Sequence, residues 1–137
     1  MAKVEETQIV TASASEVWEL IGGFNDLAMW HPGVEESTLE DGGRTRHLRL
    51  VSGGSLIERL QSFSERERSY SYSIVEGPLP VAAYLSLLGV REQTDGNCQV
   101  HWSGEFIPEG ASEQDATAIV RGIYRAGLES LRRRFGG

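Results

Sequence analysis

The C-terminal segment constrains the fold more than any other part of the chain. Apolar or small residues recur there at the three- and four-residue spacing of one helix face, over a stretch of about 20 residues. These residues are Ala116, Ile119, Val120, Ile123, Tyr124, Gly127, Leu128, Leu131 and Phe135. Ser112 and Asp115 precede the stripe with the spacing of a helix N-cap, and the arginines at 132–134 fall in the last turn, where cations favour the helix dipole. The sequence therefore predicts one long helix with a single apolar face, which must be buried against another layer.

The residues before this helix predict a meander of strands. Six strand-like segments are separated by turn sequences, and they occupy residues 34–39, 44–51, 55–63, 69–75, 81–91 and 98–107. An earlier strand is predicted at 4–12, followed by two short helices, one capped by Ser13 and one stopped by Pro32. We therefore expect an α+β fold in one domain over residues 1–137. A curved seven-stranded antiparallel sheet should wrap around the C-terminal helix and leave a cavity between the two.

The charge balance and the missing motifs exclude several classes of function. Thirteen lysines and arginines against 20 acidic residues give a net charge of −7, which opposes nucleic-acid binding. The glycine pairs match no phosphate-binding motif, the three histidines lack metal-ligand spacing, and the single cysteine cannot form an internal disulfide. No apolar run reaches the roughly 18 residues of a membrane span, and the N-terminus lacks the apolar core of a signal peptide. The sequence predicts a cytoplasmic protein without a metal, a cofactor or a membrane span.

Alternation along two neighbouring strands predicts which side chains face the cavity. The inward side chains are Arg46, Leu48 and Leu50 in one strand and Leu56, Glu58 and Leu60 in the next, with Arg49 and Arg59 facing solvent. A three-residue loop at 52–54 sets the pairing of the two strands. It would place Leu48 opposite Glu58 and Arg46 on the diagonal, within reach of the carboxylate. Arg46 and Glu58 then form either an inward ion pair or an exposed pair of little energetic consequence.

Four segments, in their order and spacing, resemble a known superfamily. They are RTRHLRLVSGGSLIERL (44–60), YSIVEG (72–77), AYLS (83–86) and IPEGASEQD (107–115). The chain resembles the START-like superfamily, which includes the polyketide cyclase/dehydrase and lipid transport group, and within it the bacterial relatives of the plant abscisic acid receptors. The resemblance covers nearly the whole chain. It implies the helix-grip fold, with a ligand cavity between the curved sheet and the long C-terminal helix.

The resemblance also assigns roles to single residues. The loop that contains Ser52, Gly53, Gly54 and Ser55 corresponds to a gate over the cavity mouth. The side chains that it places in the cavity are Arg46, Glu58, Tyr84 and His101 as a polar network and Tyr72, Ile119 and Ile123 as the apolar lining. The second short helix lies beside the mouth in this fold, where Trp30 is either a wall of the cavity or an ordinary packing residue.

Three departures argue against abscisic acid as the ligand. Pro32 stands where the receptors have the lysine that pairs with the hormone carboxylate. Leu79 and Pro80 replace the histidine and arginine of the receptors' latch loop, and the gate lacks its leucine–proline pair. We therefore expect neither abscisic acid binding nor recruitment of a phosphatase through the gate.

The segment at 98–107 gives two conflicting predictions. Plain alternation puts Trp102 and Phe106 inside and His101 outside, whereas the resemblance puts His101 in the cavity. A bulge in the strand would reconcile the two, and an intermolecular interface would explain an outward Trp102/Phe106 face. We expect His101 in the cavity.

Two functions fit these residues, and a third depends on the conflict above. The first, which we expect, is the binding of a small, largely apolar ligand (a lipid, polyketide or aromatic metabolite) as a carrier or sensor. The alternative is a cofactor-free enzyme of the cyclase or dehydratase type, in which Arg46 holds an oxyanion and Glu58 or His101 moves a proton. The third is an accessory protein that binds another protein through the Trp102/Phe106 face. The sequence leaves open the identity of the ligand and whether the chain forms a symmetric homodimer.

Overall fold

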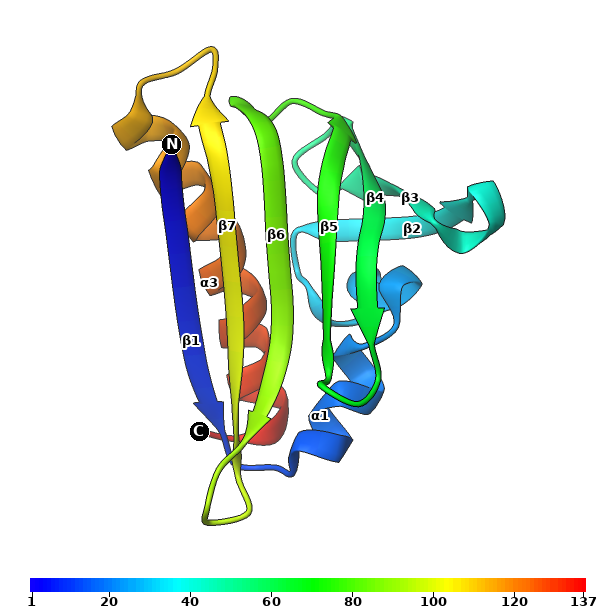
Figure 1. The fold of residues 1–137 in the computed structure, drawn as a ribbon, viewed down its shortest axis with the longest axis vertical. Helices are drawn as coiled ribbons and strands as arrows, with labels where there is room; N and C mark the ends of the chain where they lie inside the picture. Colours follow the sequence, from blue (N-terminus) through cyan, green and yellow to red (C-terminus); the bar gives the residue numbers. More distant parts are fainter.

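The predicted elements all form, in the predicted order, in a computed structural model that describes residues 1–137 (Figure 1). The seven strands make one antiparallel sheet in the order β1 (Ala2–Val10), β7 (Cys98–Pro108), β6 (Val81–Glu92), β5 (Ser69–Glu76), β4 (Ser55–Ser64), β3 (Thr45–Leu50) and β2 (Val34–Glu40). The helices are α1 (Ala14–Ile21), α2 (Leu27–Trp30) and α3 (Glu113–Phe135), with short 3₁₀ turns η1 (Phe24–Asp26) and η2 (Asp41–Gly43). The α+β prediction is confirmed, and the strand ends differ from the predicted ones by at most two residues.

The sheet is a meander completed by its first strand. Strands β2 to β7 are neighbours both along the chain and in the sheet because a short connection joins each to the next. β1 lies at the far edge beside β7, and α3 packs along these two strands, behind them in Figure 1. The short helices α1 and α2 contact β6 and β2 instead. The long helix therefore covers only part of the concave face, and the rest is closed by the segments that follow β1.

Irregular pairing bends the sheet. Register shifts interrupt the β2–β3, β4–β5 and β6–β7 pairs, at Val34/Glu36, Ile57/Glu58, Leu60/Ser62 and Ala82/Leu85. An extra residue in one strand of a pair increases its local twist and bends it. The bulge in β6 contains Tyr84 and Ala83, whose φ is 51°, and from Tyr84 onward every second side chain is buried, at Tyr84, Ser86 and Leu88. The resulting curvature holds part of the sheet away from the straight α3.

Serine side chains begin α1 and α3 as the sequence predicts. Ser13 Oγ accepts a hydrogen bond from the Glu16 N–H (3.2 Å), and Ser112 Oγ accepts one from the Asp115 N–H (3.1 Å). These bonds satisfy N–H groups that the first turn of a helix leaves without a backbone partner. None of the helices is both long and apolar enough to cross a membrane.

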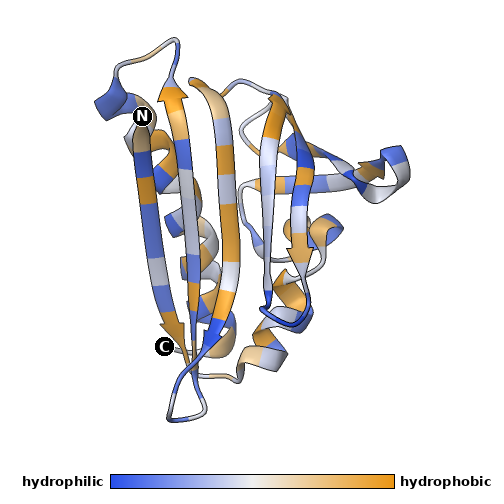
Figure 2. Ribbon diagram, in the orientation of Figure 1, coloured by the Kyte–Doolittle hydropathy of each residue, from blue (hydrophilic) through white to orange (hydrophobic).

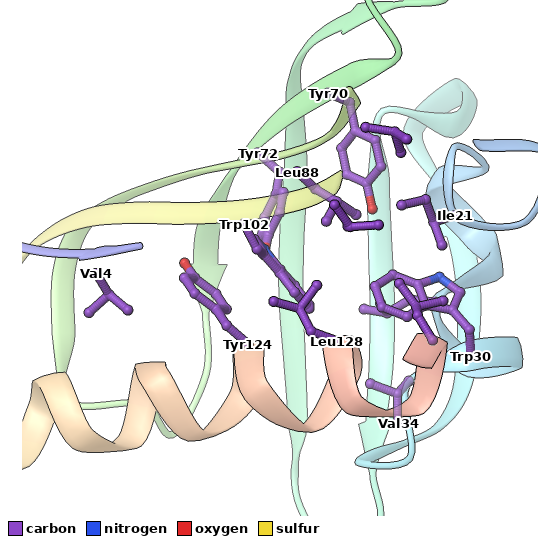
Figure 3. Close-up of a cluster of buried hydrophobic side chains, with 14 of the residues drawn as sticks. Val4, Ile21, Trp30, Val34, Tyr70, Tyr72, Leu88, Trp102, Tyr124 and Leu128 are labelled. Atoms are coloured by element: carbon purple, nitrogen blue, oxygen red, sulfur yellow. The ribbon is translucent and has the colours of Figure 1, made fainter. Parts of the chain in front are cut away.

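The core lies between the inner face of the sheet and α3. Figure 2 shows alternating apolar and polar bands along β1 and β7, as expected for strands with one buried face. At the centre of β7, the Trp102 indole stacks on the Tyr124 ring of α3, with ring centroids 4.7 Å apart. Figure 3 shows Trp102 between Tyr72 and this helix. These large rings set the separation between α3 and the sheet at this point.

Candidate functional site

An apolar cavity of about 270 Å³ lies between the inner face of the sheet and α3. Eleven of its 15 lining residues are hydrophobic, so its wall is mostly carbon. Nine residues predicted for the site line it: Leu48, Leu50, Ser52, Leu56, Glu58, Tyr72, Tyr84, Ile119 and Ile123. Six residues that were not in that set complete the lining: Leu27, His31, Gly33, Val34, Leu79 and Trp102. Ile119 is 43% exposed and Ser52 is also exposed, so these two residues mark the mouth.

His31 fastens the connection between α2 and β2 to the long helix. Its Nδ1 accepts a hydrogen bond from the Gly33 N–H (3.0 Å), so Nε2 carries the proton and donates to the Ile123 carbonyl (2.7 Å). Burial lowers the pKa of His31, which keeps the ring neutral as this pairing requires. Gly127 allows α3 to approach, because a Cβ there would lie 2.8 Å from the His31 ring and 2.7 Å from the Trp102 ring. His31 is therefore part of the cavity wall with both ring nitrogens already paired.

Arg46 and Glu58 form a buried ion pair between β3 and β4. Arg46 Nε donates to Glu58 Oε1 (2.9 Å), and Nη2 lies 2.7 Å from the same oxygen but outside hydrogen-bond geometry. Arg46 Nη1 donates to the Phe24 carbonyl (2.6 Å), and the guanidinium carbon lies 4.1 Å from the Phe24 ring centroid and 4.9 Å from that of Tyr72. The predicted inward pair is confirmed, and the exposed alternative is wrong.

Glu58 is the only residue of this pair that lines the cavity. Glu58 lines it, whereas Arg46 is 0% exposed and is enclosed by Phe24, Tyr70 and Tyr72. Burial raises the pKa of Glu58, and the positive charge of Arg46 partly offsets that rise. Both Arg46 contacts go to Oε1, so Oε2 is left without a protein partner. The cavity wall therefore includes a charge-paired acid that has one oxygen without a protein partner.

Trp102 organises a hydrogen-bond network along the inner face of the sheet. Its Nε1–H is shared between the Tyr72 hydroxyl and Ser86 Oγ, each 3.1 Å away. Ser86 in turn donates to the Ser103 carbonyl (2.9 Å). Burial raises the pKa of Tyr72 well above the usual tyrosine value, so its hydroxyl keeps its proton.

The same network continues onto α3. The Tyr124 hydroxyl lies 3.0 Å from Ser86 Oγ and also contacts the Tyr84 hydroxyl. Burial raises the pKa of Tyr124 to about 12 and that of Tyr84 well above the ordinary range. Protonated hydroxyls from β5, β6 and α3 thus lie close together at one side of the cavity.

The family of this chain follows from comparison with known proteins. Residues 1–136 match the protein family described as polyketide cyclase / dehydrase and lipid transport. The chain belongs to this family. The match confirms the resemblance that the four sequence segments indicated. No functionally curated protein matches the sequence.

Solved structures related to this family member share its fold. The protein XoxI from Bacillus cereus is 43% identical, with a TM-score of 0.96 over 98% of this chain and 96% of its own. An uncharacterised protein from Bacillus thuringiensis is also 43% identical, with a TM-score of 0.95 over 98% of both chains. A START superfamily protein from Mycobacterium smegmatis is 13% identical, and its TM-score of 0.79, over 97% of this chain and 96% of its own, shows the same helix-grip fold.

In this member of the family, His101 lies outside the cavity, and the prediction that it faces inward is wrong. β7 pairs with β1 without a register shift from Cys98 to Phe106, so alternation is strict there and Trp102 takes the inward position. His101 lies on the outer face over Gly89, where a Cβ would come within 2.5 Å of the imidazole Nε2. The bulge that could have reversed β7 lies in β6 instead.

The Trp102/Phe106 face is not available to a protein partner. Both side chains are buried beneath α3, with exposed fractions of 1% for Trp102 and 0% for Phe106. The accessory-protein hypothesis required these side chains to be on the surface. That hypothesis is therefore wrong.

Three other residues predicted for the site do not line the cavity. Trp30 is buried and packs against Trp102 with ring centroids 5.6 Å apart, so its alternative role as a packing residue holds. Arg46 is covered by Glu58 and the aromatic rings described above. Leu60 is partly buried against the hydrophobic core, beside a register shift of β4.

The register of β3 and β4 also differs from the predicted one. Leu48 pairs with Leu56 rather than with Glu58, and Arg46 is directly opposite Glu58 rather than on its diagonal. The predicted three-residue loop at 52–54 is too short, because the ladder already ends at the pair between residues 49 and 55. Direct opposition of Arg46 and Glu58 accounts for their close contact.

The predicted gate loop contributes little to the cavity wall. Ser52 lines the cavity, whereas Gly53, Gly54 and Ser55 are exposed and do not. Gly53 and Gly54 have φ values of 96° and 84°, a conformation that glycine adopts without steric cost. The role of this loop as a gate stays a prediction.

A second hollow lies on the opposite, outer face of the sheet. Its volume is about 460 Å³, larger than that of the cavity, but only three of its 11 lining residues are hydrophobic. Small-molecule sites are usually concave and mostly apolar with a few polar groups. The cavity beneath α3 is therefore the better candidate site.

Proposed function

We propose that this protein binds a small, largely apolar molecule in the cavity between the sheet and α3, as a carrier or sensor. The observation that carries the proposal is the composition of the wall, which is hydrophobic at 11 of 15 positions and has one carboxylate. Such a wall favours transfer of an apolar molecule out of water, and its few polar groups orient that molecule. The description of the family, which includes lipid transport, agrees with this function.

The alternative function as an enzyme receives less support. The cyclase or dehydratase hypothesis needed Arg46 to hold an oxyanion and His101 or Glu58 to move a proton. Arg46 is enclosed behind Glu58, and His101 lies on the outer face. Of these three residues, only Glu58 lines the cavity. Binding of an apolar ligand needs no further polar side chain. Catalysis by the proposed mechanism would need an oxyanion-binding group beside Glu58, and neither Arg46 nor His101 supplies it.

The test is to block the mouth of the cavity and measure binding. Ile119 lines the cavity and is partly exposed on α3, so Ile119→Trp should extend a large ring across the mouth without disturbing the core. Ala118→Trp is the matched control, because Ala118 is exposed in the same helical turn but does not line the cavity. The neutral fluorescent probe N-phenyl-1-naphthylamine should bind the wild-type protein and Ala118→Trp but bind Ile119→Trp at least about 10-fold more weakly. Equal binding to the two variants, or no binding to the wild type, would contradict the proposal.

A further inference from the structure

Some polar side chains of the cavity already make all their hydrogen bonds within the protein, and others do not. His31 has both nitrogens paired, to Gly33 and Ile123. Trp102 has a single N–H, which is already shared between two hydroxyls. Ser52 lies at the exposed mouth. Glu58, Tyr72 and Tyr84 remain as groups that an enclosed ligand could meet.

The Tyr84 hydroxyl has no free proton to donate to a ligand. We assign the single Ser86 proton to the Ser103 carbonyl, which can only accept, and in this assignment Tyr124 donates to Ser86. Tyr124 then has no proton left, and Tyr84 must donate in the contact between the two tyrosine hydroxyls. A hydroxyl has one proton to give. The Tyr84 proton is therefore occupied within the protein.

Tyr72 is left with an unused donor. Its hydroxyl oxygen accepts from Trp102, and in the same assignment no protein acceptor is left for its own proton. Ser86 is the neighbouring hydroxyl, and in this assignment both of its acceptor positions are filled, by Trp102 and by Tyr124. A buried donor without an acceptor is unfavourable, and a group of the right chemistry in the cavity would relieve it.

Glu58 is left with an unused acceptor. Arg46 contacts only Oε1, and the nearly buried Glu58 lines the cavity. No protein group donates to Oε2. The cavity interior thus offers one acceptor, from Glu58, and one donor, from Tyr72, on neighbouring strands β4 and β5.

The charge of the cavity limits the ligand further. The Arg46–Glu58 pair is neutral as a whole, so a charged ligand would bring an unpaired charge into an apolar space, which costs several kcal/mol. A carboxylate would also meet the carboxylate of Glu58, because Arg46 is covered and cannot reach it. An uncharged polar group avoids both costs.

We infer that the ligand carries an uncharged hydroxyl group, of an alcohol or a phenol, that donates to Glu58 Oε2 and accepts from the Tyr72 hydroxyl. A hydroxyl is the smallest neutral group that can do both. The inference rests on the proposed function and specifies its ligand class: a hydroxylated apolar molecule, small enough for a cavity of about 270 Å³. Free fatty acids and other carboxylates are excluded by it.

The test compares ligands rather than Glu58 variants, because removing the Glu58 charge would leave Arg46 buried without its partner. Isothermal titration calorimetry would measure two series: 2-naphthol, 2-methoxynaphthalene and 2-naphthoate, and 1-octanol, octyl methyl ether, octanoate and octylamine. Each alcohol or phenol should bind about 10-fold more tightly than its methyl ether, which cannot donate to Glu58. The carboxylates and the amine should bind more weakly than the alcohols.

A pair of variants tests the second hydrogen bond. Tyr72→Phe should weaken binding of 2-naphthol about 5-fold, since it removes the free donor and keeps the ring. Tyr70→Phe is the matched control, because it removes the same atom two residues away on β5, where the hydroxyl accepts from Arg46 outside the cavity. It should leave binding unchanged.

The outcomes separate this inference from the proposed function. If ethers bind as tightly as alcohols, if carboxylates bind more tightly, or if Tyr72→Phe has no effect, the hydroxyl inference is wrong while the apolar cavity still binds ligands. If no member of either series binds, the proposed function fails and the inference fails with it.

Discussion

Replacing Arg46 with methionine tests the buried ion pair that shapes the cavity. The substitution keeps a long apolar side chain but removes the charge, the bond to Glu58 and the bond to the Phe24 carbonyl. Glu58 would then be an uncompensated buried acid, and breaking such a pair on one side costs about 3–5 kcal/mol. Domains of this size are typically stable by about 5–15 kcal/mol, so the loss should be a large part of the total.

Arg49 provides the control for this measurement. It lies on the same strand and its Nη2 is 2.7 Å from Glu36, the same separation as that between Arg46 and Glu58, but it is 59% exposed. Exposed pairs contribute about 0–1 kcal/mol, so Arg49→Met should change the free energy of unfolding by no more than that. Urea denaturation at pH 7, followed by tryptophan fluorescence, measures both variants.

The cost of Arg46→Met should also depend on pH. Burial raises the pKa of Glu58 in the folded protein, and loss of Arg46 raises it further, above the unfolded value of about 4.3. The folded state then holds more protons than the unfolded state between these two pKa values, so stability falls as pH rises through that window. The variant should therefore lose less stability at pH 4.5 than at pH 7. The double variant Arg46→Met/Glu58→Leu should recover most of the loss, because an apolar pair can replace a buried ion pair.

If Arg46→Met costs no more stability at pH 7 than Arg49→Met does, the Arg46–Glu58 pair does not behave as a buried ion pair. A cost that does not change with pH would equally contradict the role given to Glu58. In either case solvent would screen the Arg46–Glu58 pair. The inference that the cavity disfavours charged ligands would then lose its support.

Two further predictions concern the packing of the core. Gly127→Ala should destabilise the protein by about 1–3 kcal/mol in urea denaturation, because the added Cβ would press on the rings of His31 and Trp102. Gly122→Ala is the control: Gly122 has open space around it, so this variant should be neutral or stabilising by up to about 1 kcal/mol. Equal effects of the two alanines would show that α3 does not approach the sheet as described. Cys98 is fully buried, and burial raises the pKa of its thiol. The native protein should therefore react with a thiol reagent such as DTNB much more slowly than the urea-unfolded protein does. Rapid labelling of the native protein would contradict the burial of Cys98.

Much of the fold could be predicted from the sequence because its elements carry local signals. The apolar stripe of α3, the caps at Ser13 and Ser112, and the alternation of apolar and polar residues all depend on neighbours in the chain. Strand register was harder to predict, because it depends on the length of the turn after β3 and on two glycines with positive φ. The pairing of Arg46 with Glu58 was predicted, but its geometry was not.

The site could be predicted only where one strand face or the resemblance pointed to it. His31 and Val34 were missed because they belong to an irregular connection whose path depends on contacts with Ile123 and Gly127, far along the chain. The family resemblance predicted an inward His101, but strict alternation in β7 puts His101 on the outer face. The free acceptor of Glu58 and the free donor of Tyr72 could not be predicted from the sequence, because they depend on which side chains contact one another in the fold.

Native mass spectrometry of the protein purified from its own host would show whether the cavity beneath α3 holds a small apolar molecule. We expect a retained, uncharged, hydroxylated compound that is lost from Ile119→Trp and kept by Ala118→Trp. Repeated recovery of the unliganded mass alone, together with no binding of either ligand series, would contradict it.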